Sequence, residues 1–131
     1  MQLCEDIRDA LLNAGICLND YEVVQVKEKF GSLRWYDMNG NSSIDEIIQK
    51  YEYLSAHVCI HCGKIDVPLY GGWISPFCDV CADEFCIKDA QIREANLQNT
   101  FNQSQFHHGQ IIEKTIDISD ILEKIGYKKD K

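Results

Sequence analysis

Four cysteines in the middle of the chain have the spacing of a metal site. They form two Cys-x-x-Cys pairs with fifteen residues between them: Cys59, Cys62, Cys78 and Cys81. Zinc prefers four soft ligands in a tetrahedron, and the two residues inside each pair let both sulfurs turn inward on one backbone bend. A fifteen-residue gap is usual for four-cysteine sites. The sequence therefore predicts one structural Zn²⁺ per chain.

Other residues leave alternatives open. His57, His61 or Cys86 could replace one ligand, and the four cysteines could also be unliganded core residues or include a redox pair. His107 and His108 could bind metal adventitiously, although they have no partners in sequence. The three cysteines outside the pairs (Cys4, Cys17 and Cys86) are expected to be small buried hydrophobic residues.

A site made of four thiols argues against catalysis at the ion. Four thiolates complete the coordination sphere and leave no position for water. The sequence contains no His-x-Glu, no His-Glu-x-x-His and no phosphate-binding glycine motif. We therefore expect a non-enzymatic protein. An enzyme would need a site assembled from residues that are scattered along the sequence.

The elements around the cysteines follow the order knuckle, hairpin, helix. Gly63 comes directly after the first pair, where a positive φ is expected. Residues 65–70 and 73–77 are expected as two strands that bring the pairs together. The second pair opens a helix over roughly residues 79–96, and the N-terminal dipole of this helix favours thiolate. This order is that of a treble clef or zinc ribbon.

Two helices are predicted before the zinc lobe. Apolar residues at helical spacing predict an amphipathic helix over residues 3–14, which Gly15 ends and which carries Asp6 on its charged outer face. A capping box begins at Ser43 and starts a second helix, which runs up to the first cysteine pair.

Residues 22–37 alternate in the manner of a β-hairpin. Gly31 and Ser32 suit the loop of a type II′ turn, which pairs Phe30 with Leu33. One face then carries the apolar residues Val24, Val26, Phe30, Leu33 and Trp35. The other, which we call the basic face, carries Lys27, Lys29, Arg34 and Tyr36. We interpret the basic face as solvated or covered by helix 3–14. The alternative is a contact patch for phosphate, an acidic protein or a nucleic-acid base.

The C-terminal part begins with a polar stretch. Residues 97–110 are expected as a loop or linker. Ile118, Ile121, Leu122 and Ile125 form one apolar helical stripe, which Gly126 ends, and the tail 128–131 is expected to fray. The fold class is therefore α+β, with a helix–hairpin–helix lobe (1–58), a four-cysteine zinc lobe (59–96) and a loop with a C-terminal helix (97–131).

Composition and charge limit the classes of partner. No apolar run is long enough to cross a membrane, and the N-terminus lacks a signal-peptide pattern. An odd count of seven cysteines argues against a closed disulfide framework. We therefore expect a cytoplasmic protein. The net charge of −8 disfavours binding to nucleic acid and favours a protein partner with a basic or nucleic-acid-binding surface.

Two stretches together resemble a known group of proteins. The first is the predicted hairpin sequence Val26-Lys-Glu-Lys-Phe-Gly-Ser-Leu-Arg-Trp-Tyr36, and the second is the four-cysteine module with Gly71-Gly72-Trp73. They resemble small uncharacterised bacterial and prophage zinc-ribbon proteins, over roughly residues 24–82. The resemblance implies a bacterial or phage origin and zinc ligation by the four cysteines. It implies no activity.

Two functional hypotheses follow. The first is a zinc-stapled protein-interaction module, such as a phage or mobile-element accessory protein or an inhibitor of a host protein. An acidic inhibitor of a nucleic-acid-processing host enzyme could act by mimicking DNA. The second is a treble clef that binds nucleic acid through Lys27, Lys29, Arg34 and Tyr36. Salt-sensitive binding to DNA or RNA would separate the second hypothesis from the first.

Overall fold

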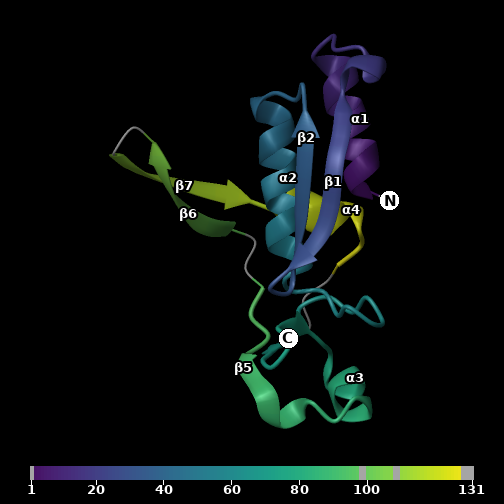
Figure 1. The fold of residues 1–131 in the computed structure, drawn as a ribbon, viewed down its shortest axis with the longest axis vertical. Helices are drawn as coiled ribbons and strands as arrows, with labels where there is room; N and C mark the ends of the chain where they lie inside the picture. The colour runs from purple at the N-terminus through teal and green to yellow at the C-terminus, as the bar shows by residue number, and fades with distance from the viewer. Residues whose placement is uncertain (1, 98–99, 108–109, 128–131) are drawn as a thin grey trace. The chain divides into compact units, whose positions relative to one another are not determined.

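Two helices and a β-hairpin build the first half of the chain (Figure 1). The computed structural model describes residues 2–97, 100–107 and 110–127. The first elements in chain order are α1 (Gln2–Asn13), a 3-10 turn (Leu18–Asp20), β1 (Glu22–Lys29), β2 (Ser32–Met38) and α2 (Ser42–Ser55). β1 and β2 form a two-stranded antiparallel sheet.

Shorter elements follow α2. They are β3 (Leu69–Tyr70), β4 (Ser75–Pro76), α3 (Asp79–Glu84), a 3-10 turn (Lys88–Ala90), β5 (Gln91–Arg93), β6 (Thr100–His107), β7 (Gln110–Asp117) and α4 (Ser119–Lys124). Strands β4, β3 and β5 form one sheet in that order, and β6 pairs with β7. The chain forms two compact units, residues 1–96 and 97–131. The predicted α+β class is confirmed.

The first core is aliphatic and joins α1 to α2. Its buried members are Leu3, Ile7, Leu11, Ile44 and Ile48, and Leu33 and Trp35 of the hairpin pack against them. The helical spacing of these residues is the signal that predicted both helices. After α1, Gly15 has a φ of 73° and the Ile16 amide donates to the Leu11 carbonyl, so the predicted helix end is confirmed.

Asp6 corrects the predicted outer face of α1. Its side chain is buried, not exposed, because it accepts hydrogen bonds from Tyr51 Oη at 2.6 Å and from Gln2 Nε2 at 2.9 Å. A buried carboxylate is tolerated when such donors replace water. Tyr51 lies in α2, so this polar contact joins the same two helices as the aliphatic core.

The turn of the first hairpin differs from the prediction. Lys29 pairs with Ser32, so the loop residues are Phe30 and Gly31, with φ values of 53° and 85°. Two positive φ values are the mark of a type I′ turn, not type II′. Glu28 therefore takes the predicted place of Phe30 opposite Leu33. The shift is two residues along β1, so the predicted sharing of a face by Val26, Leu33 and Trp35 is unaffected.

A β-bulge changes the face at the start of β1. The register shifts between Val23 and Gln25, and Val23 pairs with Asp37. Val23 lies with Leu11 and Trp35 around a cavity of about 210 Å³, so it is Val23 that faces α1. Val24 is the extra residue of the bulge and has no partner in β2, so the regular alternation on which its predicted face depends is interrupted here.

The start of α2 is set by Asn41 and not by Ser43. Asn41 Oδ1 accepts from the Ile44 amide at 3.0 Å, and the helix begins at Ser42. Asparagine is among the strongest N-cap residues, so it outcompetes the capping box that begins two residues later.

The helix after the second cysteine pair is much shorter than predicted. α3 ends at Glu84, and Cys86 follows with a φ of 57°. The Ile87 amide then donates to the Ala82 carbonyl at 2.9 Å, which closes a Schellman motif. Residues 91–93 leave the helical direction and pair with β3 instead.

The C-terminal unit contains a hairpin where a loop was predicted. Residues 100–107 form β6 and pair in register with β7, from Thr100–Asp117 to His107–Gln110. Strand β7 is rich in β-branched residues, which favour pairing and give the polar stretch a partner. The predicted helix is confirmed as α4, with Ile121 and Leu122 inside it. The predicted fraying of residues 128–131 falls outside the described residues.

Candidate metal centre

The first cysteine pair lies on a tight bend after α2. The Cys59 amide donates to the Lys64 carbonyl at 2.7 Å, and the Gly63 amide donates to the Cys59 carbonyl at 2.9 Å. Gly63 has a φ of 82°, which confirms the predicted positive φ. An isolated bridge between Val58 and Ile65 closes the base of the loop. The bend therefore turns the two side chains of the pair to the same side.

The second pair opens α3, as predicted. Cys78 is the N-cap residue and Cys81 lies in the first turn. Cys78 Sγ accepts from the Cys81 amide at 3.5 Å, so the thiol occupies the position that a serine or aspartate cap would normally fill. The helix N-terminus thus presents amide hydrogens to the sulfur.

Two strands and their backbone contacts bring the pairs together. The predicted hairpin is present but reduced to β3 and β4, joined through Gly71 and Gly72. The Ile60 amide donates to the Pro76 carbonyl at 3.0 Å, so the first bend is tied directly to β4. The Phe77 amide donates to the Pro68 carbonyl at 3.2 Å. The order knuckle, hairpin, helix is therefore the predicted one.

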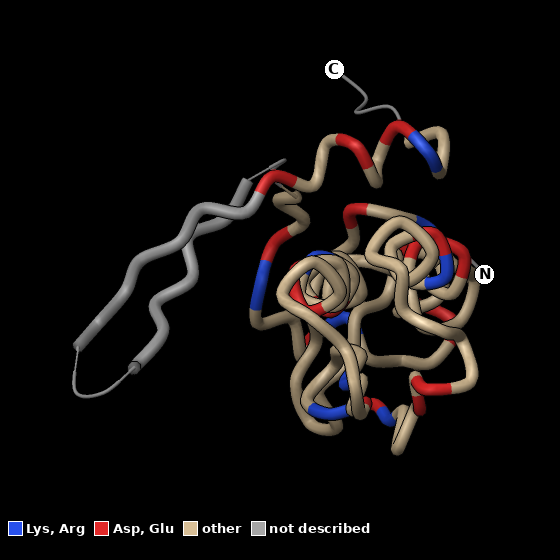
Figure 2. The backbone as a smooth tube through the Cα atoms, turned by 90° about the horizontal axis from the view of Figure 1, so that it is seen from above, with Lys and Arg blue, Asp and Glu red and all other residues tan. Residues whose placement is uncertain are grey.

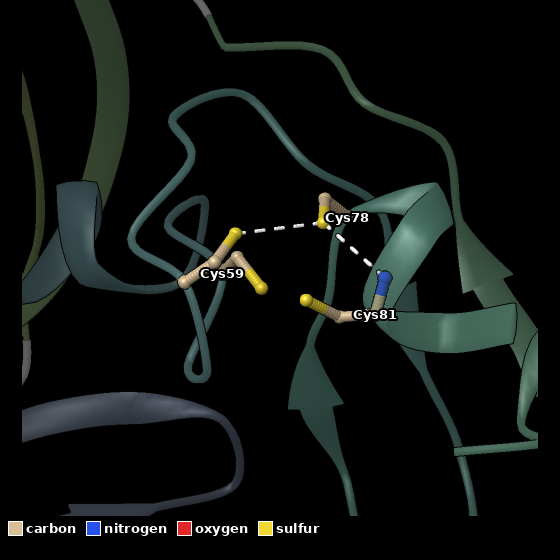
Figure 3. A group of neighbouring side chains, drawn as sticks. Cys59, Cys78 and Cys81 are labelled. Carbon is tan, nitrogen blue, oxygen red and sulfur yellow. Dashed lines mark hydrogen bonds between the residues drawn. The ribbon is translucent and has the colours of Figure 1, made fainter. Parts of the chain in front are cut away.

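The four thiols converge. The sulfur atoms of Cys59, Cys62, Cys78 and Cys81 all lie within 4.8 Å of one another. Figure 3 shows the labelled thiols turned toward one another from the two segments. Zn–S bonds of about 2.3 Å in a tetrahedron place the sulfurs about 3.8 Å apart. Cys62 Sγ and Cys78 Sγ are 3.5 Å apart, so only a small change in the sulfur–sulfur distances would be needed to hold the ion.

Burial and hydrogen bonding act in opposite directions on these thiols. Burial disfavours the Cys59 thiolate, but the amides of Cys62, Cys78 and His61 outweigh it and lower the pKa of Cys59 to about 6. Burial raises the pKa of Cys81. Four thiols this close therefore do not ionise together unless a cation compensates their charge.

The other residues considered as ligands do not join the group. Within the described residues, only the four cysteines bring ligand atoms together here. The ring of His61 instead packs edge-on against Phe85, with 5.1 Å between centroids. Cys86 is exposed in the left-handed position after α3. The side chains of His107 and His108 lie outside the described residues.

His57 is a buried structural residue beside the site. Its ring packs against Tyr53, and burial with a further effect of Arg93 lowers the pKa of His57 to about 4. Arg93, in β5, donates to the carbonyls of Ala56 and Val67. Because Ala56 is the C-cap of α2, this guanidinium joins the end of the helix to the zinc lobe.

Gly31 is where the first hairpin contacts the zinc lobe. A Cβ atom on Gly31 would lie 3.0 Å from Leu69 Cδ1 and 3.3 Å from the Ile74 carbonyl oxygen. The glycine thus allows both the turn and the close approach of two backbones. The Phe30-Gly31 pair is the sequence signal for this contact, but a turn at Gly31 and Ser32 does not predict it.

The basic face is present, and part of it is neutralised. The observed register places Lys27 opposite Arg34, with Tyr36 diagonal to Lys27. Lys27 Nζ lies 5.4 Å from the Tyr36 ring centroid, and Arg34 forms an ion pair with Glu52 of α2 at 3.3 Å. Because α1 packs with Leu33 and Trp35 on the other face, helix 3–14 does not cover the basic face.

The three cysteines outside the group and most of the described charged residues lie at the surface. Cys4, Cys17 and Cys86 are exposed, so the prediction that they are buried is wrong. Lys and Arg positions are interspersed with Asp and Glu positions along the described chain and form no extended basic block (Figure 2). No helix of the described chain is both long and apolar enough to span a membrane.

Comparisons with protein families, with curated proteins and with solved structures found no match to this chain. The arrangement of its own residues therefore carries the functional argument.

Proposed function

We propose that the chain binds one structural zinc ion through Cys59, Cys62, Cys78 and Cys81, and that it acts as a non-enzymatic protein-interaction module. The observation that carries the first part is the convergence of four sulfurs within 4.8 Å of one another. A tetrahedral set of four thiolates suits zinc or a single iron better than hard cations. Zinc differs from iron in having no redox chemistry, and a zinc–thiolate site is colourless.

Three features support a structural role for the ion. Four thiolates close the coordination sphere. Three of the four sulfurs belong to buried residues, so substrate would have little access. The buried residue His57 has its pKa lowered to about 4 by burial, which suits packing better than proton transfer near neutral pH.

Exposed apolar residues of the first hairpin and of the loop between β3 and β4 support an interaction role. Phe30 and Trp73 are 67% and 83% exposed, and Val24, Val26 and Met38 are exposed as well. Large aromatic side chains at such exposure are typical anchors of protein interfaces. The net charge of −8 favours a partner with a basic surface, and the resemblance to prophage zinc-ribbon proteins supports a phage or mobile-element accessory or inhibitor protein.

Metal analysis tests the first part. Protein purified without added zinc should contain about one equivalent of zinc and no visible iron absorption. Cys78→Ser should lose the metal, whereas Cys86→Ser, which changes an exposed cysteine outside the group, should retain it. Full zinc content in Cys78→Ser would remove the basis of the proposed site.

Affinity capture tests the second part. The zinc-loaded protein should retain a specific protein from a bacterial host lysate, and Cys78→Ser should not. A partner captured equally well by the metal-free variant would separate the interaction from the zinc lobe. Competition by excess DNA would identify a partner that uses its nucleic-acid-binding surface. Undiminished capture in excess DNA would exclude DNA mimicry.

Nucleic-acid binding is a second candidate, favoured by one observation. Lys27 and Lys29 lie beside the exposed rings of Tyr36 and Phe30, a pairing of cations and stacking surfaces that suits single strands. Affinity for an oligonucleotide should then fall steeply with salt and be reduced in Lys27→Glu. Absence of binding at about 50 mM salt would remove this candidate.

A further inference from the structure

The two outer edges of the first sheet differ in how their backbone groups are used. On the β2 edge, the Leu33 amide donates to Ser55 Oγ at 2.7 Å, and the Trp35 amide approaches Glu52 Oε1 at 3.5 Å. Side chains of α2 therefore cover that edge. Strand β1 pairs only with β2 among the described residues, and all eight of its residues are exposed.

The register identifies which groups of β1 face outward. In an antiparallel pair, residues opposite each other direct their amides either both toward or both away from the neighbouring strand. The amides of Leu33 and Trp35 point away from β1, toward α2. Their partners Glu28 and Val26 must therefore direct their own N–H and C=O groups away from β2. The free edge thus offers two donors and two acceptors.

An apolar groove lies beneath the same edge. Its volume is about 610 Å³, and Val26 and Glu28 line it together with Leu3, Leu33, Leu54 and Ile60. The Glu28 carboxylate accepts from the Gly31 amide at 2.7 Å, so this charge is already occupied. A strand added to β1 would direct every second side chain toward the groove.

The opposite face of the edge is cationic. Lys27 and Lys29 lie there, whereas Arg34 on the same face is occupied by Glu52. The end of the edge is aromatic, because Phe30 and Trp73 border a second cavity of about 310 Å³. Phe30 holds this place at a positive φ, which a bulky residue rarely adopts.

We propose that β1, over residues 25–29, receives an extended peptide segment of a partner protein in which apolar residues alternate with acidic residues. The apolar residues would enter the groove, and the carboxylates would face Lys27 and Lys29. The bulge before Gln25 limits the regular edge to five residues, or about 17 Å. The proposal rests on the proposed interaction function and specifies how the partner is bound.

A peptide fits these features better than two other occupants. A single-stranded nucleic acid lacks the regular alternation of N–H and C=O groups that pairs with a strand edge. A second copy of this chain that pairs through the same edge would bring its own Lys27 and Lys29 to the two lysines already there.

The test selects peptides from a random nine-residue display library on the full-length zinc-loaded protein. The enriched peptides should alternate apolar and acidic residues. Val26→Pro should weaken binding of the best synthetic peptide by more than about tenfold, because it removes an outward N–H without breaking the ladder to β2. Val26→Ala, which keeps that N–H, is the matched control. Zinc content and thermal melting check that each variant is folded.

Two further measurements do not depend on a proline. Methylation of alternate backbone nitrogens of the peptide should abolish binding in one register only. Lys27→Glu combined with Lys29→Glu should weaken binding by about three- to tenfold. The inference would be overturned if the enriched peptides bound equally well after N-methylation, to the double lysine variant and to Val26→Pro. Failure to enrich any peptide would overturn it as well.

The outcomes distinguish this inference from the proposed function. If a zinc-dependent protein partner binds Val26→Pro as tightly as the unchanged protein, the strand-addition mode fails and the interaction function stands. If no protein partner binds in any condition, both fail. A concentration-dependent dimer that Val26→Pro disrupts, or an oligonucleotide that this variant no longer binds, would assign the edge to another occupant.

Discussion

The two lobes of residues 1–96 are held together by different chemistry. The first has five buried aliphatic residues from α1 and α2 at its centre, with hairpin residues packed around them. The centre of the second consists of Cys59, Cys78, Cys81 and one aliphatic residue, Val67. Burial of hydrocarbon stabilises the first lobe without any ligand. The core of the second lobe buries little hydrocarbon, so its stability should depend on a metal ion that binds the four cysteines as thiolates.

The largest expected effect is selective unfolding of the second lobe on metal removal. Structural zinc contributes on the order of 10 kcal/mol in small four-ligand domains. Chelation, or Cys81→Ser, should therefore expose the amides of residues 57–93 to hydrogen exchange while those of α1 and α2 stay protected. Cys86→Ser should leave both lobes unchanged. Equal protection of both lobes without metal would show that the second lobe is held by packing alone.

The converse change should affect the first lobe. Ile44 is fully buried, and Ile44→Ala should lower the free energy of unfolding by about 2–5 kcal/mol. Zinc content should stay near one equivalent, because the ligands belong to the other core. Leu12→Ala, at an exposed site on α1, is the control and should change stability by less than about 0.5 kcal/mol. Loss of zinc from Ile44→Ala would show that the lobes fold as one cooperative unit.

The contact between the lobes can be measured with two glycines of nearly equal φ. Gly31 has a φ of 85° and Gly72 a φ of 84°, but only Gly31 has neighbours within 4 Å of a new Cβ. Both Gly→Ala changes should cost about 1–2 kcal/mol from the left-handed conformation. Gly31→Ala should cost about 1–3 kcal/mol more through overlap with Leu69 and Ile74. Equal melting temperatures for the two variants would mean that the hairpin turn moves away without loss.

The smallest effect concerns Tyr21 in the first lobe. Burial, partly offset by a hydrogen bond from Trp35 Nε1 at 3.0 Å, raises the pKa of Tyr21 to about 12. A folded pKa above the ordinary value of 10 means that its stabilising effect is complete below pH 10 and is lost as pH rises toward 12. Burial also raises the pKa of Tyr70, so absorbance titration should show more than one late tyrosine. Tyr21→Phe should remove one of the late transitions and leave that of Tyr70. A single transition near pH 10 for all tyrosines would contradict this assignment.

Local patterns were sufficient for the parts of this protein that short-range physics governs. The spacing of the four cysteines, the positive φ at Gly63, the helix that Cys78 caps and the amphipathic periods of α1 and α2 were all predictable. In each case the deciding residues lie within one short segment, and the longest such segment is the one from Cys59 to Cys81. The alternation that places Lys27, Arg34 and Tyr36 on one face is equally local.

Non-local contacts decided the rest. The first hairpin turns at Phe30 and Gly31, and Gly31 packs against the zinc lobe. The bulge at Val24 turns Val23 toward α1. Tyr51 makes burial of Asp6 possible, and β3 gives residues 91–93 a strand partner. Pairing with residues 110–117 makes a strand of a polar stretch that was predicted as a loop.

The sequence by itself determined that four thiols would be available in two rigid bends, because ligand type and spacing are written along the chain. Only the tertiary structure decided that the thiols converge to within 4.8 Å and that the hairpin turn lies on their lobe. It also decided that α2 covers one edge of the first sheet and leaves the other open. These outcomes depend on contacts between residues far apart in sequence, whose free energies no local pattern contains.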